Sequence, residues 1–233
     1  MANLLAIDTS SAWCSVALSL GDQIELRQEL ASAGASQLLL PWIETLLSNA
    51  NIGLKDVDAI AVGIGPGAFT GVRLGVAAVQ GLAISHNLPV ISVTSLDAIA
   101  AQVVASNTFK DINPEEFVIA IDARMEEVYW GRYKNQLGQL PKRIGDICLT
   151  KPEDIELEGI GYLAGSAINA YGDRFPKFNG VLDSEIAISS LGILACAEQL
   201  LAQGMQQDVR QLEPLYVRNK VALTTAEREE AFK

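Results

Sequence analysis

The chain has 233 residues, a formal net charge of −11 and an apolar fraction of 49%. A chain of this length can bury a full hydrophobic core, in one large domain or two small ones. No uninterrupted apolar stretch reaches the roughly 20 residues that span a bilayer, which excludes a membrane-spanning class and predicts no membrane partner. The acidic charge disfavours tight direct binding of a phosphate backbone, so we expect any role on RNA to pass through a partner.

The N-terminal segment predicts the compartment, and the cysteines predict no covalent framework. The opening residues have no basic region and no small-residue cleavage site, and they run directly into a strand-like segment. The protein is therefore expected to be cytoplasmic. Cys14, Cys148 and Cys196 are odd in number and far apart, so the sequence predicts neither a disulfide framework nor a zinc knuckle.

The first half begins with three strand-like runs, over residues 5–8, 13–20 and 23–30. Strands and helices then alternate, which is typical of an α/β sheet of mixed direction. The expected elements are a helix over residues 36–49, a strand over 58–63, a glycine-rich loop with a helix over 70–85, a strand over 89–93 and a helix over 95–105.

The second half repeats the opening of the first. Ile119-Ala120-Ile121-Asp122 echoes Leu5-Ala6-Ile7-Asp8, and each copy is followed by a polar turn and a second strand-like run. A strand over 161–164 and a helix over 191–203 follow, whereas residues 141–159 are polar and turn-rich. Repetition at this distance predicts duplicated domains, over residues 1–106 and 107–233, with a C-terminal segment from about 205 to 233 packing back on the first domain.

Two halves that each open with strand, Asp, turn and strand predict a duplicated actin-like fold (ASKHA, ribonuclease H-like), with mixed sheets flanked by helices. In that superfamily, the two Asp-bearing turns face each other across a nucleotide cleft, which makes Asp8 and Asp122 candidate residues of a vestigial cleft. The alternative is that each Asp is a turn residue whose carboxylate accepts hydrogen bonds from nearby backbone N–H groups.

The glycine-rich loop, residues 63–75, lies between an apolar run and a helical segment, a pattern that can present backbone N–H groups to an anion. Gly65 and Gly67 are its candidate nucleotide contacts. However, Val72 and Arg73 occupy the place where phosphate-binding loops carry Lys and a hydroxyl. The second interpretation is therefore that the glycines let the start of a helix pack closely against a sheet.

Residues that would support independent chemistry are scarce. The single histidine, His86, follows a helix end, so neither a His-Glu-x-x-His peptidase site nor a nucleophilic triad is expected. The carboxylates show no metal-ligand spacing, and we expect no catalytic residues and no bound metal. An independent nucleotide-dependent phosphotransferase or ATPase that uses Asp8 and Asp122 remains the alternative.

Two apolar helices form a candidate partner surface. The helix over 70–85 is apolar or small almost all round, so it must be covered on both sides, either within the domain or by another protein. The helix over 36–49 adds a leucine stripe beside an off-stripe Trp. The candidate interface residues are Leu38, Leu39, Trp42, Ile43, Leu46, Val72, Gly75, Val76, Val79 and Leu82.

Four segments spread over nearly the whole chain resemble the TsaB (YeaZ-like) family of bacterial proteins needed to make threonylcarbamoyladenosine in tRNA. They are residues 5–9 (LAIDT), 65–75 (GPGAFTGVRLG), 121–130 (IDARMEEVYW) and 213–218 (EPLYVR). The long second and third segments make chance a poor explanation. The sequence departs from the family at Ala68, usually Ser, at Glu126, usually Gly, and at Ala35, often His.

The resemblance implies a non-catalytic scaffold subunit that binds and activates the catalytic paralogue TsaD, together with the ATPase TsaE. It also implies that the two apolar helices pair with TsaD, or with a second copy in a homodimer when the protein is isolated, and that tRNA is contacted only indirectly. No cofactor is expected to bind tightly, and ATP or ADP is expected only at the interface of the complex.

Overall fold

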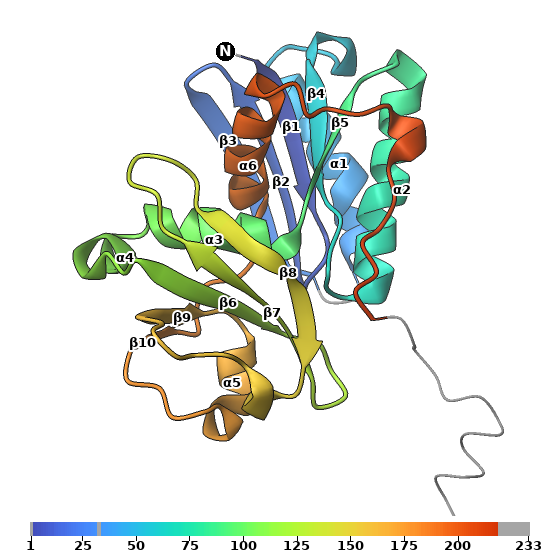
Figure 1. The fold of residues 1–233 in the computed structure, drawn as a ribbon. Coiled ribbons are helices and arrows are strands. Elements are labelled where there is room, and N and C mark those ends of the chain that lie inside the picture. Colours follow the sequence, from blue (N-terminus) through green and yellow to red (C-terminus); the bar gives the residue numbers. More distant parts are fainter. Residues whose placement is uncertain (1, 32–33, 219–233) are drawn as a thin grey trace, which may run out of the picture.

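Two five-stranded sheets with the same topology form the framework of the molecule (Figure 1). The computed structural model describes residues 2–31 and 34–218. The first sheet has the order β3-β2-β1-β4-β5 and the second has the order β10-β9-β6-β7-β8. Each sheet contains an antiparallel three-stranded meander followed by two strands parallel to its first strand. The predicted duplicated actin-like fold is confirmed.

The strands of the first sheet are β1 (Asn3–Asp8), β2 (Trp13–Leu20), β3 (Gln23–Leu30), β4 (Ala59–Gly63) and β5 (Val90–Val93). Those of the second sheet are β6 (Glu116–Asp122), β7 (Val128–Lys134), β8 (Lys142–Thr150), β9 (Tyr162–Ala164) and β10 (Val181–Asp183). The α-helices are α1 (Ala35–Asn49), α2 (Phe69–His86), α3 (Ser95–Ala105), α4 (Asn107–Ile112), α5 (Ala167–Tyr171) and α6 (Ser190–Ala202).

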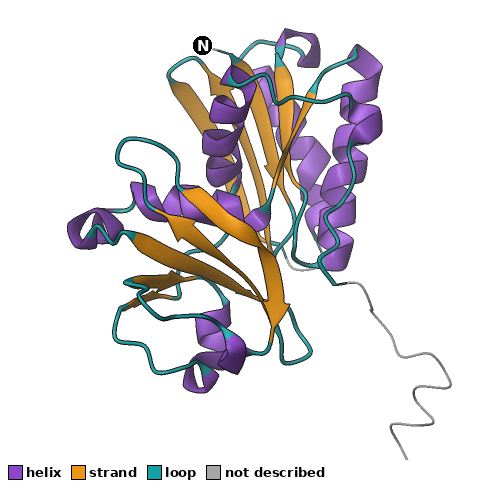
Figure 2. Cartoon of the chain, viewed as in Figure 1, coloured by secondary structure: helices purple, strands orange, loops and turns teal. Residues whose placement is uncertain are grey.

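Helices cover both faces of the first sheet (Figure 2). Helices α1 and α2 pack on one face through a cluster that includes Leu39, Ile43 and Val76. Helix α6 packs on the opposite face, against β1, β2, β4 and β5, and α3 lies beside it. The two helices approach closely because Gly192 of α6 has no side chain, and a Cβ there would overlap the carbonyl oxygen of Ala98 in α3.

The layer of α3 and α6 lies between the two sheets. Helix α3 also packs against β6 and β7, and one hydrophobic cluster contains buried residues of both sheets, such as Leu4, Ile91, Phe117 and Tyr162. The expected boundary between residues 106 and 107 therefore crosses a shared core, and the division into domains stays a prediction.

The chain returns to the first sheet with α6, earlier than the expected start near residue 205. Beyond α6, the C-terminal strap (residues 207–218) pairs with β5 through Gln207 and Val90 and then follows α2 (Figure 1). Gln80 of α2 donates a hydrogen bond to the Leu212 carbonyl at 2.9 Å. The rest of the segment expected to pack back, residues 219–233, lies outside the described residues.

Strand β8 runs through the stretch expected to be polar and turn-rich. It pairs with β7 as the third strand of the second meander, with a register shift between Trp130 and Arg132. Its side chains are exposed or half-buried throughout. The hydrophobic alternation that would have indicated a strand is therefore weak, and cross-strand pairing decides the conformation.

None of the helices in the described part of the chain combines the length and the hydropathy that crossing a bilayer requires.

Candidate functional site

The glycine-rich loop between β4 and α2 is packed against the turn that follows β1. A Cβ at Gly71 would overlap the carbonyl oxygen of Thr9, and a Cβ at Gly67 would overlap the carbonyl oxygen of Ser10. The N–H of Ala68 donates a hydrogen bond to the same Ser10 carbonyl at 2.7 Å. The chain's own backbone therefore occupies the space beside the loop, and the geometry favours the packing interpretation of its glycines.

Asp8, a candidate for the nucleotide cleft, lies in the interior at the end of β1. Its side chain is completely buried, and a Cβ at Gly63 would overlap its Oδ1 atom. The hydroxyl of Ser10 donates to Oδ1 at 2.8 Å, and the Ser10 N–H donates to Oδ2 at 3.3 Å. Ser10 also lies 3.1 Å from the hydroxyl of Ser95, the first residue of α3. The carboxyl group therefore holds this junction together.

Burial raises the pKa of the Asp8 carboxyl to about 6, and the hydrogen bonds from Ser10 offset part of this increase. Desolvation is the larger cause because a charged carboxylate loses its hydration in the interior. The partners Ser10 and Ser95 cannot be recognised in the sequence, since isolated serines carry no periodic or spacing signal.

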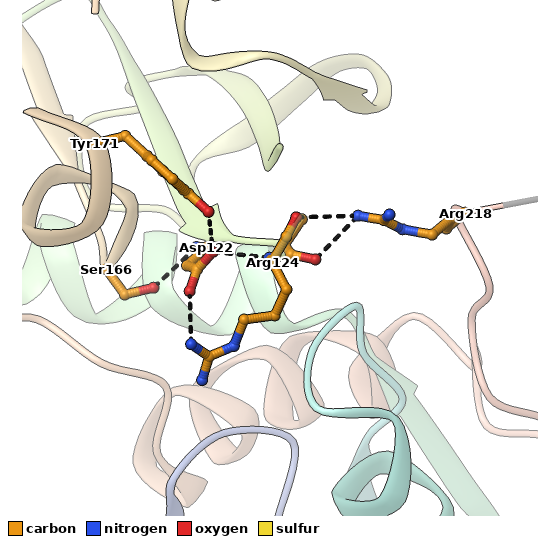
Figure 3. A network of polar contacts seen from close by, with 6 residues as sticks. Asp122, Arg124, Ser166, Tyr171 and Arg218 are labelled. Carbon is orange, nitrogen blue, oxygen red and sulfur yellow. Dashed lines mark hydrogen bonds and ion pairs between the residues drawn. The ribbon is translucent and has the colours of Figure 1, made fainter. Parts of the chain in front are cut away.

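Asp122 occupies the corresponding position at the end of β6 (Figure 3). Its Oδ1 accepts hydrogen bonds from the Arg124 N–H at 2.7 Å and from the Tyr171 hydroxyl at 2.9 Å, and its Oδ2 lies 3.3 Å from the Arg124 guanidinium. The Asp122 N–H donates to the hydroxyl of Ser166 at 3.1 Å. These bonds match the alternative in which Asp122 is a turn residue.

The turn after Asp122 has three consecutive left-handed residues that are not glycine. Arg124, Met125 and Glu126 have φ values of 61°, 55° and 60°. Each such residue costs about 1–2 kcal/mol of conformational free energy. Glycine adopts a left-handed φ without steric cost, which is a physical reason why the family that the sequence resembles usually has Gly at position 126.

Arg218 at the end of the strap holds this turn (Figure 3). Its Nη2 donates to the carbonyls of Ala123 at 3.0 Å and Arg124 at 3.3 Å, and it lies 2.8 Å from a carboxylate oxygen of Glu127. The Arg218 side chain is only 13% exposed. The strap therefore connects α2, in the first half, to the strained turn of the second half. In the sequence, Arg218 stands out only as the last residue of the segment over residues 213–218.

The guanidinium group of Arg73 contacts two aromatic side chains. Its guanidinium lies 3.8 Å from the ring centroid of Phe69, and its Nε donates to the Tyr216 hydroxyl at 2.9 Å. Phe69 and Tyr216 are each about half exposed. This exposed stack at the start of α2 uses the only basic side chain of the glycine loop.

Most of the expected partner residues are buried within the monomer, and their part in an interface stays a prediction. Residues of α1 and α2 that face the first sheet are buried in the monomer's own core, which removes them from the surface; these residues are Leu39, Ile43, Leu46, Val72, Gly75, Val76 and Val79. Leu38, Trp42 and Leu82 are half-buried against the same cluster. This packing is what the intramolecular alternative expects for this face of the helices.

The opposite face of α2 is open to solvent. It comprises Phe69, Thr70, Arg73, Ala77, Gly81 and Ile84, which we call the outer face of α2. Ile84 is 60% exposed, and a Cβ at Gly81 would meet no atom within 4 Å. Apolar and small side chains on an exposed helix face are typical of a protein-binding surface.

His86 is the last residue of α2 and is exposed, and its Nδ1 lies 2.7 Å from the Ser85 hydroxyl. Within residues 2–31 and 34–218, no three His, Cys, Asp or Glu side chains gather in a way that could hold a metal ion. That the protein works without a metal stays a prediction.

Replacing Gly71 with Ala should destabilise the protein by about 1–3 kcal/mol, because the new methyl group forces α2 away from Thr9. Gly81→Ala, in the same helix but in open space, should instead stabilise it by up to about 1 kcal/mol. Urea titrations measure the free energy of unfolding, which should fall for Gly71→Ala and rise for Gly81→Ala. A neutral Gly71→Ala variant would contradict the packing role of the loop.

Asp8→Asn should increase stability at pH 8 and have little effect near pH 3. Because the folded-state pKa of Asp8 is raised from 3.8 to about 6, its stabilising contribution is complete below pH 3.8 and is lost as the pH rises through 6. At pH 8 the ionised Asp8 therefore lowers the free energy of unfolding by roughly 3 kcal/mol at most, since one pKa unit is worth about 1.4 kcal/mol. Urea titrations of both proteins at the two pH values measure the difference, and an equal gain at both would exclude this titration as the cause.

Arg218→Ala should loosen the turn over residues 123–127, because its carbonyls and Glu127 lose a charged partner. We expect amide hydrogen exchange in the turn to accelerate by about tenfold or more, as for a charged hydrogen bond of 1.5–3 kcal/mol. Arg210→Ala is the matched control, since Arg210 is 73% exposed and pairs only with Asp208 among the ion pairs of the described residues. Equal exchange in both variants would show that Arg218 does not hold the turn.

Comparisons with known proteins agree with this architecture. A family model described as "TsaD: tRNA N6-adenosine threonylcarbamoyltransferase" matches residues 24–222. The "tRNA threonylcarbamoyladenosine biosynthesis protein TsaB" of Escherichia coli (strain K12) is 34% identical over 94% of this chain and 96% of its own. Its counterpart from Haemophilus influenzae (strain ATCC 51907 / DSM 11121 / KW20 / Rd) is 35% identical over 94% of both chains.

A solved structure, "YeaZ from Pseudomonas aeruginosa", superposes with a TM-score of 0.84 and 37% identity, covering 93% of this chain and 100% of that one. These matches span almost the whole length of the chain. The chain belongs to the TsaB (YeaZ-like) family.

Proposed function

We propose that this protein acts in the biosynthesis of tRNA threonylcarbamoyladenosine as a non-catalytic subunit, which binds and activates a threonylcarbamoyltransferase of the TsaD type. The named relatives in the family carry this biosynthetic role in their names. The single observation that carries the non-catalytic part is the packing of Thr9 and Ser10 against the glycine loop, because it leaves Asp8 inside the protein.

The candidate chemical groups support a scaffold over an enzyme. The carboxylates of Asp8 and Asp122 both accept hydrogen bonds from their own turns, and Arg73 stacks on Phe69. A phosphotransferase needs a carboxylate and cationic groups directed at the transferred phosphoryl group. We therefore expect this chain to contribute binding energy through its surface.

The outer face of α2 is the surface that we assign to the transferase. It contains Ala77 and Gly81, whose small size allows a partner helix to approach closely, between the larger apolar groups of Phe69 and Ile84. Exposed apolar side chains of this kind supply the centre of stable interfaces. We include in the proposal a TsaE-type ATPase as a third subunit, contact with tRNA only through the transferase, and no tightly bound nucleotide on the isolated chain.

Ala77→Arg should weaken binding to the TsaD-type transferase of the same organism by about tenfold or more, since a long charged side chain would separate the helices. Ala77 is exposed and Arg is a good helix former, so the melting temperature should change little. Val76→Glu is unsuitable, because it would bury a charge in the core. Titration calorimetry measures the affinity.

The matched control is Glu198→Arg, an exposed position on α6 at the opposite face of the first sheet. This variant should bind the transferase with nearly wild-type affinity. Equal affinity of the Ala77→Arg variant would contradict the assigned surface. Magnesium-dependent turnover of ATP by the isolated chain would contradict the non-catalytic role and favour the phosphotransferase alternative.

A further inference from the structure

An open pocket of about 780 Å³ lies where the loop that joins β7 to β8 comes close to α4 and α6 (Figure 1). Its volume is within the range of ordinary ligand sites. The lining comes from the C-terminal end of α3, from α4 and the residue after it, from the loop over residues 135–140 and from one side of α6. These residues are separate from the glycine loop and from the outer face of α2, so the pocket is a second place where the molecule can bind.

The floor of the pocket is apolar. Val104, Phe109, Leu140 and Ala195 line it, and Phe109 is only 2% exposed, so this part belongs to the core. Leu137 at the tip of the loop also lines the pocket, but it is 85% exposed. An apolar group that enters the pocket would therefore remove both the floor and Leu137 from water, which is favourable.

The rest of the lining is rich in side-chain amides, each of which can donate and accept hydrogen bonds. Within the described part of the chain, the four glutamines among them make no side-chain hydrogen bond, which leaves their groups available to a ligand; the six amide residues are Asn113, Asn135, Gln136, Gln139, Gln199 and Gln203. The charged residues of the lining are Lys110 and Glu198, and the Lys110 ammonium already donates to the Ala105 carbonyl at 2.7 Å. The lining therefore favours an uncharged ligand.

Asn113 and Asn135 hold one another in a defined orientation. The Nδ2 of Asn135 donates to Oδ1 of Asn113 at 2.9 Å and to the Pro114 carbonyl at 3.1 Å. Because a carbonyl only accepts, the bond to Pro114 fixes which end of the Asn135 amide is which. The Oδ1 of Asn135 and the Nδ2 of Asn113 then remain as an acceptor and a donor on adjacent side chains. The N–H and the C=O of one residue in an extended peptide point to the same side, so they can bond to both.

We propose that this pocket binds an extended, uncharged peptide segment of another protein. One large apolar side chain of the segment lies on the floor beneath Leu137, and the amide side chains bond to its backbone. Peptide groups match the lining because they present donors and acceptors in equal number, and the residue side chain supplies the apolar group that the floor requires. The inference does not depend on the proposed function, since it rests on the lining alone.

Titration of the full chain with the blocked tripeptide acetyl-Ala-Leu-Ala-amide tests the pocket, with heteronuclear NMR spectra as the readout. The side-chain amide signals of Asn113 and Asn135 should shift with a dissociation constant of about 1 mM or below, an ordinary affinity for a probe of this size. Acetyl-Ala-Ser-Ala-amide should bind at least about tenfold more weakly, because it lacks the apolar group that the floor buries.

Asn113→Gly should weaken binding of the Leu tripeptide by about fivefold or more, because the ligand loses a donor and Asn135 loses its partner. The residue ends α4 in the left-handed region, with φ of 46°, which glycine adopts readily, so the variant should fold. Asn87→Gly is the matched control. Asn87 ends α2 in the same conformation, with φ of 53°, and lies outside the pocket, so this variant should bind like the wild type.

Leu137→Ser gives an independent check on the apolar part of the pocket. Because the side chain is almost fully exposed, the melting temperature should stay unchanged. Affinity for the Leu tripeptide should fall by about threefold or more, whereas affinity for the Ser tripeptide should change little.

Four results would overturn the proposal. They are an absence of shifts at peptide concentrations about tenfold above the expected constant, equal binding of the Leu and Ser tripeptides, equal affinity of the Asn113→Gly and Asn87→Gly variants, and tighter binding of a neutral sugar, methyl glucoside, than of the Leu tripeptide. The last result would assign the amide lining to hydroxyl groups in place of peptide groups.

Discussion

The contact between the turn after β1 and the glycine loop before α2 is the constraint on which the rest of the structure depends. Thr9 and Ser10 touch the backbone of the loop where Gly67 and Gly71 have no side chains. This contact sets α2 against the first sheet and encloses Asp8 beneath it. A loop of the kind that binds phosphate in other proteins is here a packing joint, because its neighbour is protein backbone.

The two halves are held together by contacts of different kinds. The layer of α3 and α6 buries apolar side chains of both sheets in one cluster. At the other contact, Arg218 neutralises Glu127 and bonds to carbonyls of a turn with three left-handed residues. Strain of this type persists only where surrounding contacts impose it, and the strap supplies them.

The exposed side of α2 and the buried polar groups beneath the helix differ physically. The outer face of α2 carries apolar and small side chains beside Thr70 and Arg73, so a partner that packs there would depend on contacts between side chains. The polar groups around Asp8 lie in the interior and stabilise the contact between the glycine loop and the turn after β1.

The sequence by itself determined the duplicated fold, the first meander, the helix over residues 95–105 and the family, because periodicity, glycine placement and long segments are local properties of a chain. Tertiary structure alone decided which side of α1 and α2 is buried, that β8 is a strand, and that α6 returns to the first sheet. It also decided that Asp8 is buried and that Arg218 donates a hydrogen bond to the Arg124 carbonyl. These features depend on contacts between residues far apart in the chain, and an almost wholly apolar helix such as α2 carries no pattern that distinguishes its core face from its outer face.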